Sequence, residues 1–160
     1  MKNKILLALF LLSLFLRVVS LFTSLVKWWD ETVYANLGWD LVSNPFDYSF
    51  AKKWSDYTKD WPRAGYRAPL LPYTLALIYA LTNSQILVDL FMPFVGSLSV
   101  IILYLLTDKL FNHRIAFYSS ILLSFLPIHV FYSSKIMTDV YAVFFLLISV
   151  LSFWLGFEKG

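Results

Sequence analysis

The sequence ILLALFLLSLFLRVVSLFTSLV, residues 5–26, is an almost unbroken apolar run, and it decides the class of fold. A helix of this length spans about 33 Å, which is enough to cross the roughly 30 Å hydrocarbon core of a bilayer. Lys2 and Lys4 precede the run, and LFTSLVKWW at its end is a poor signal-peptide cleavage site. We therefore predict a retained transmembrane helix. Arg17 interrupts it and should snorkel or face other helices, because a charge is costly in lipid.

The rest of the chain is also strongly apolar, with 59% hydrophobic and 14% charged residues over 160 positions and no cysteine. A soluble domain of this size could not bury so much apolar surface. Runs at 86–107, 115–132 and 140–157 predict three more spanning helices, in which neighbouring helices accommodate Pro93 and Pro127. The run 69–83 is shorter and leaves open a tilted span, a half-span or an interfacial helix. The predicted fold is an all-α polytopic membrane protein with about four transmembrane helices.

Residues 27–68 are the one polar region, and they are predicted to form the first outer loop. Five tryptophans are interleaved with acidic and basic residues there, so the loop is expected to carry amphipathic helices along the membrane surface. The stretch DETVYANLGWDLV, residues 30–42, reads as one such helix, ended by SNPFD. The net charge of +3 is small and forms no basic run, so no nucleic-acid partner is expected.

The basic residues predict which connectors share a side of the membrane. If 69–83 does not cross, the inside holds Lys2, Lys4, Lys109, Arg114 and Lys159, as the positive-inside tendency favours. The loop 27–68 then opens on the same outer face as SSKIMTD, residues 133–139. Three carboxylates and three basic residues are thus expected in one layer: Asp30, Glu31, Asp139, Lys135, Arg63 and Arg67.

Such a layer suits group transfer. A carboxylate can act as a general base for a hydroxyl acceptor, and basic residues can hold a phosphate leaving group. Each acid also has a structural interpretation, because Asp139 could cap a helix and Asp30 could begin one. Tyr34, four residues after Asp30, would share its helical face and could orient that carboxylate or simply pack at the interface.

Four stretches in order resemble the N-terminal part of the GT-C superfamily of membrane glycosyltransferases, nearest its protein O-mannosyltransferase and aminoarabinose transferase branch. WWDETVYAN is similar to the family's Asp-Glu motif after the first helix, and YRAPLLPYTLALIYALT to its Arg-Pro-Pro-Leu segment. MPFVGSLSVIILYLLTDKLFNHRIAFYSSILLSFLP looks like the link between the next two helices. YSSKIMTDVYAVFF is similar to the second acidic site.

The resemblance implies transfer of a sugar, hexose or mannose, from a polyprenyl-phosphate donor to a protein or glycolipid acceptor at the outer membrane face. Asp30 matches the catalytic base and Glu31 its partner. Asp139 matches the second acid of the cavity and Arg67 the arginine that opens the Arg-Pro-Pro-Leu segment. Some relatives bind a divalent cation between their acids and others do not, so any metal here would fall on Asp30, Glu31 and Asp139.

Relatives have about ten or more spanning helices, so the chain is not expected to be a complete enzyme on its own. It is expected to be the N-terminal part of a larger enzyme in the plasma membrane of a prokaryote, with a split subunit or an inactive remnant as the alternatives. Its partners would then include the bilayer and the remaining helices. A second interpretation stays open: a non-catalytic membrane scaffold that binds a lipid or a partner through the aromatic loop. Replacement of Asp30 distinguishes the two, since a scaffold would tolerate it.

Overall fold

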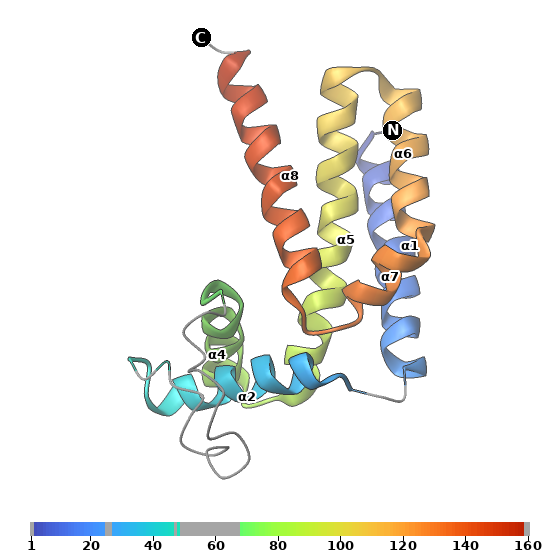
Figure 1. Cartoon of the computed structure of the whole chain (residues 1–160). Helices are drawn as coiled ribbons and strands as arrows, with labels where there is room; N and C mark the ends of the chain where they lie inside the picture. The colour runs from blue at the N-terminus through green and yellow to red at the C-terminus, as the bar shows by residue number, and fades with distance from the viewer. Residues whose placement is uncertain (1, 25–26, 47, 49–67, 159–160) are drawn as a thin grey trace. The chain divides into compact units, whose positions relative to one another are not determined.

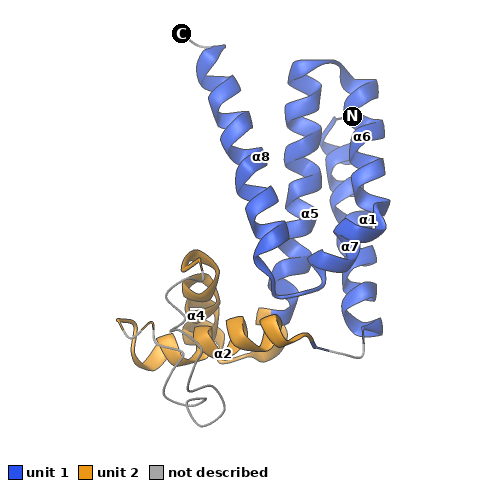
Figure 2. Ribbon diagram, viewed as in Figure 1, with its two compact units in different colours: residues 1–27, 89–160 blue, residues 28–88 orange. Residues whose placement is uncertain are grey.

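The computed structural model describes residues 2–24, 27–46, 48 and 68–158, and every regular element within them is an α-helix. The chain divides into two compact units, shown in Figure 2: unit 1 comprises residues 1–27 and 89–160, and unit 2 comprises residues 28–88. Among the described helices, three are long and apolar enough to cross a membrane, and a bent pair gives a fourth candidate. The predicted class, an all-α polytopic membrane protein, is confirmed.

Unit 1 is a helical bundle built from both ends of the chain (Figure 1). Its helices are α1 (Lys2–Thr23), most of α5 (Gln85–Leu110), α6 (His113–Phe125), α7 (Pro127–Ser133) and α8 (Thr138–Phe157).

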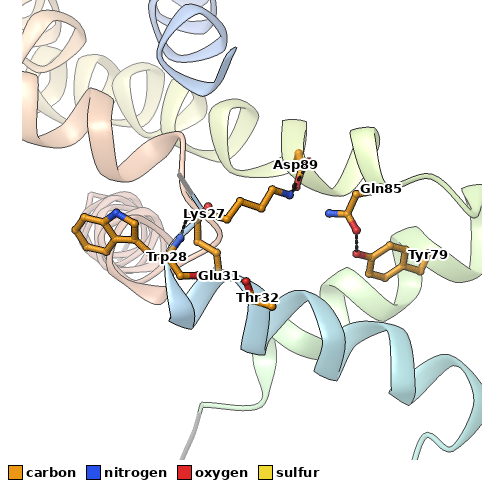
Figure 3. Close-up of polar contacts among 7 residues, drawn as sticks. All are labelled: Lys27, Trp28, Glu31, Thr32, Tyr79, Gln85 and Asp89. Carbon is orange, nitrogen blue, oxygen red and sulfur yellow. Dashed lines mark hydrogen bonds and ion pairs between the residues drawn. The ribbon is translucent and has the colours of Figure 1, made fainter. Parts of the chain in front are cut away.

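Two ion pairs show that α1 and α5 run antiparallel. Lys2 Nζ lies 2.7 Å from Asp108 at one end of the pair, and Lys27 Nζ lies 3.0 Å from Asp89 at the other (Figure 3). The chain therefore leaves unit 1 after Lys27 and re-enters it at Asp89, at the same end of that unit. Asp89, a carboxylate inside a predicted spanning run, has Lys27 as its partner.

The run 115–132, predicted as a single helix, is broken in the structure. α6 ends at Phe125, α7 begins at Pro127, and the two helices are bent by 62°. Leu126 between them has extended backbone angles of φ −62° and ψ 112°. Proline lacks an N–H and disfavours helical geometry in the residue before it, which explains the break. Pro93, by contrast, lies inside the continuous helix α5.

Charged side chains gather at the end of unit 1 where α1 begins and α5 ends. Asp108 contacts His113 as well as Lys2. Lys109 Nζ donates to Glu158 at 2.8 Å just after α8. The hydrogen bond from Lys109 holds the pKa of the Glu158 carboxyl below its ordinary value.

Unit 2 is a pair of packed helices, α2 (Trp29–Ser43) and α4 (Leu70–Thr82). Gly38 permits their close approach, because a Cβ there would lie 2.8 Å from Leu75 Cβ. The rings of Trp39 and Tyr79 meet edge to face at a centroid distance of 5.1 Å. Asn83 ends α4 in the left-handed conformation, with φ 50°, a position that asparagine tolerates.

Candidate functional site

The predicted acid pair opens α2, where the two side chains have different environments. Trp28 is the N-cap residue and has extended backbone angles. Its backbone N–H donates to Glu31 Oε2 at 2.8 Å (Figure 3), and the Glu31 side chain is only 4% exposed. A glutamate at the third helical position that accepts from the N-cap N–H is one half of a capping box. Glu31 therefore fixes the start of the helix.

Asp30 occupies the second position of α2 and is partly exposed. The partial positive charge of a helix N-terminus favours a carboxylate in this turn. A general base must be accessible to the group whose proton it accepts, and the partial exposure of Asp30 meets that requirement. Tyr34, one turn further on, is buried, with 6% of its surface exposed.

The second predicted pair, Lys135 and Asp139, lies at the start of α8 in unit 1. The N-cap residue is Met137, which makes no side-chain cap hydrogen bond. Asp139 follows at the second helical position, in the first turn, and is exposed. Capping by Asp139 is thus not how α8 begins. Lys135 is 2% exposed, and its ammonium lies 5.7 Å from the Phe131 ring centroid, within reach of a cation–π interaction.

Asp30 and Asp139 therefore share one local setting: each is the second residue of a helix whose N-cap side chain is not a capping residue. They belong to different units, so their predicted opening into one cavity stays a prediction. Arg63 and Arg67 lie outside the described residues.

A buried polar cluster in unit 1 centres on Arg17, which faces other helices, one of the two placements expected. Arg17 is fully buried, and its Nη1 donates to the backbone oxygen of Ser13 at 2.9 Å and to the hydroxyl of that residue. Its Nη2 lies 2.7 Å from His129 Nδ1 on α7. Arg17 Nε and His129 Nε2 are buried and have no hydrogen-bond partner among the described residues.

The third helix that packs against this cluster is α5, which approaches it at Gly96. A Cβ at this position would lie 2.6 Å from Ser133 Cβ and 2.9 Å from Arg17 Nε. Ser133 also donates to the backbone oxygen of His129. Polar contacts of the cluster thus join α1 and α7 in a region where lipid could not satisfy them, and α5 packs against the cluster at Gly96.

Sequence reasoning did not assemble this cluster. The spacing of four between Ser13 and Arg17, and between His129 and Ser133, was a usable signal, because such residues share a helical face. The contact between the two pairs joins positions 112 residues apart and leaves no local pattern.

The described residues do not fit a preformed metal centre. Within them, no group of three or more His, Asp or Glu side chains is placed to hold an ion. Glu31, the partner of Asp30, is buried and engaged with the Trp28 N–H.

Comparison with protein-family models matches residues 66–160, more than half of the chain, to the family described as dolichyl-phosphate-mannose-protein mannosyltransferase. The matched part contains α4 to α8, with Lys135, Asp139 and Arg67, and begins after Asp30 and Glu31. No match was found among curated proteins or solved structures.

Proposed function

Because the chain belongs to the dolichyl-phosphate-mannose-protein mannosyltransferase family, we propose that it transfers a hexose such as mannose to a hydroxyl of a protein or glycolipid. The family is one of membrane glycosyltransferases that use a polyprenyl-phosphate sugar, and the apolar helices of this chain agree with an integral membrane protein. The acceptor, the outward-facing site and the plasma membrane of a prokaryote are parts of the proposal.

In the proposed reaction, Asp30 is the general base. Its carboxylate takes the proton of the acceptor hydroxyl as that oxygen attacks the anomeric carbon. The bond between the anomeric carbon and the phosphate oxygen breaks, and polyprenyl phosphate leaves with the electron pair. The reaction is balanced, because the proton ends on Asp30 and the charge on the departing phosphate.

The remaining assignments follow from charge and position. Lys135, Arg67 and Arg63 are proposed to bind the phosphate, since cationic donors make strong hydrogen bonds to phosphate oxygens. Asp139 is proposed to contact the sugar from the start of α8. Glu31 and Tyr34 are positioning residues for the turn that carries Asp30.

The observation that supports the proposal is the difference in environment between Glu31 and Asp30 at the start of α2. Glu31 is buried against the N-cap N–H, whereas Asp30 is partly exposed beside it. A helix that needed only a cap would be served by Glu31 alone. Asp30 is therefore the acid of the pair whose side chain a substrate can reach.

The test is sugar transfer in membranes that contain the chain together with any segments it works with, supplied with labelled polyprenyl-phosphate hexoses. Asp30→Asn keeps the size of the side chain and removes its basicity, so kcat/KM should fall by about 100-fold or more. Asp40→Asn, the same change at an exposed site of α2, is the matched control and should transfer normally. Wild-type transfer by Asp30→Asn would exclude this base and favour the scaffold interpretation.

A further inference from the structure

A cavity of about 370 Å³ opens at the end of unit 1 where α1 and α6 begin. Its lining includes three basic side chains, Lys2, His113 and Arg114. The same cavity is lined by Ile5 and Phe117. It lies within one unit, and none of its residues was assigned a role in the proposed transfer.

The lining changes character with depth. Lys2 is the first residue of α1, and His113 and Arg114 are the first two of α6. Ile5 and Phe117 come three or four residues later, which places them about 5 Å deeper along their helices. The cavity is thus basic where the helices begin and apolar one turn inside.

Tyr104 of α5 adds to the apolar part. It is 2% exposed and packs with Leu9 and Ala116 in a core cluster of α1, α5 and α6. This packing gives the cavity a fixed wall, because a buried ring held by three helices has little freedom to move.

The rim keeps an excess of positive charge. Asp108 contacts both Lys2 and His113 and balances the charge of Lys2, so the charge of Arg114 remains. Arg114 is exposed, and only its backbone N–H, bonded to Asn112, has a hydrogen bond to a described residue. Its guanidinium is therefore the cation that the rim presents to a ligand.

We propose that this cavity binds an anionic phospholipid of the bilayer, with the phosphate at the Arg114 and Lys2 rim and the first carbons of an acyl chain against Ile5, Tyr104 and Phe117. In a helix that spans the membrane, the first residues lie at headgroup depth. Basic pockets between transmembrane helices bind anionic headgroups. A soluble phosphate would leave the apolar wall unmatched, so the lipid is the better fit. The inference rests on the membrane assignment and is independent of the transfer reaction.

The experiment uses the full chain, purified in a neutral detergent, with lipid binding measured by native mass spectrometry. Dioleoylphosphatidylglycerol should bind about tenfold more tightly than dioleoylphosphatidylcholine. Arg114→Gln should weaken phosphatidylglycerol binding about fivefold, and Arg114→Lys should retain most of it. Lys4→Gln is the matched control, since Lys4 is an exposed cation at the same end of α1 outside the cavity, and it should have little effect.

Three results would overturn the inference. Equal binding of the two lipids would show that the cavity does not recognise the negative charge of the headgroup. An equal loss in Lys4→Gln and Arg114→Gln would show diffuse attraction to a positive surface. Competition by glycerol 3-phosphate at the concentration at which the lipid binds would show a site for soluble anions. Phe117→Ser tests the apolar half and should weaken the lipid without changing any binding of glycerol 3-phosphate, and far-ultraviolet circular dichroism of each variant verifies its fold.

Discussion

Replacing Gly96 by alanine should be disproportionately damaging for so small a change. The added methyl carbon would lie 2.6 Å from Ser133 Cβ and 2.9 Å from Arg17 Nε, closer than carbon and nitrogen atoms approach without displacement. Ser133 Cβ is attached directly to the backbone of α7, so relief requires a shift of the helix itself. The change therefore tests the contact by which the Arg17 cluster is closed.

The magnitude follows from two opposed terms. Overpacking a close contact costs about 1–3 kcal/mol, and the upper part of that range applies where backbone-attached atoms collide. Alanine gains about 1 kcal/mol over glycine inside a helix. For Gly96→Ala the free energy of unfolding should fall by about 2 kcal/mol, which lowers the Tm of a chain of this size by about 4–8 °C.

The assay is thermal unfolding of the detergent-purified chain, followed by circular dichroism. Gly156→Ala is the matched control, because a Cβ at Gly156 has nothing within 4 Å, and its Tm should be unchanged or slightly raised. Ser133→Gly should recover part of the loss when combined with Gly96→Ala, since it removes the Ser133 side-chain atoms from the collision and leaves only Arg17 Nε. If the alanines at Gly96 and Gly156 shift the Tm alike, the reasoning about this contact is wrong.

Three further predictions concern other parts of the chain. Gly38→Ala should loosen α2 from α4, because its Cβ meets Leu75 Cβ at 2.8 Å; amide hydrogen exchange should quicken in α2 and stay unchanged in α8. Reversing the charge of Lys27 or Asp89 alone should cost about 1 kcal/mol, while the exchanged pair restores stability; no recovery in the exchanged pair would show that the ion pair does not hold these ends together. A cysteine at Asn44 should react with an impermeant thiol reagent outside intact cells and one at Asn112 should not, and the opposite pattern would reverse the proposed orientation.

The membrane fold could be predicted because lipid imposes a simple rule. Each spanning segment must satisfy its own backbone hydrogen bonds, so an apolar run of about twenty residues predicts a helix without knowledge of its neighbours. The runs 5–26 and 140–157 correspond to α1 and α8 in this way. Pro93 and Pro127 were treated alike, although α5 continues through the first and the chain breaks before the second. That difference depends on packing, which no local pattern records.

The candidate site was predictable in its residue types and less so in their roles. The adjacent acids were evident, but which one serves the helix start depends on the N-cap position. The sequence signal for a capping box is serine or threonine at the N-cap and glutamate three residues later. Here the N-cap residue is Trp28, so the sequence does not show this signal. Arg17 was expected to face either other helices or the interface. Its partner His129 could not be named, because the two meet only after the bundle forms.

The ion pair between Lys27 and Asp89 has a consequence for how the molecule can diversify. The pair holds together the two ends of unit 1 between which residues 28–88 are inserted. Unit 2 is therefore an insertion whose entry and exit points lie side by side in unit 1. The entropic cost of closing a loop between two fixed ends rises only slowly with the length of the loop. Insertions, deletions or replacements between these two residues should therefore leave the bundle intact, and the segment that carries Asp30 can be exchanged while the bundle persists.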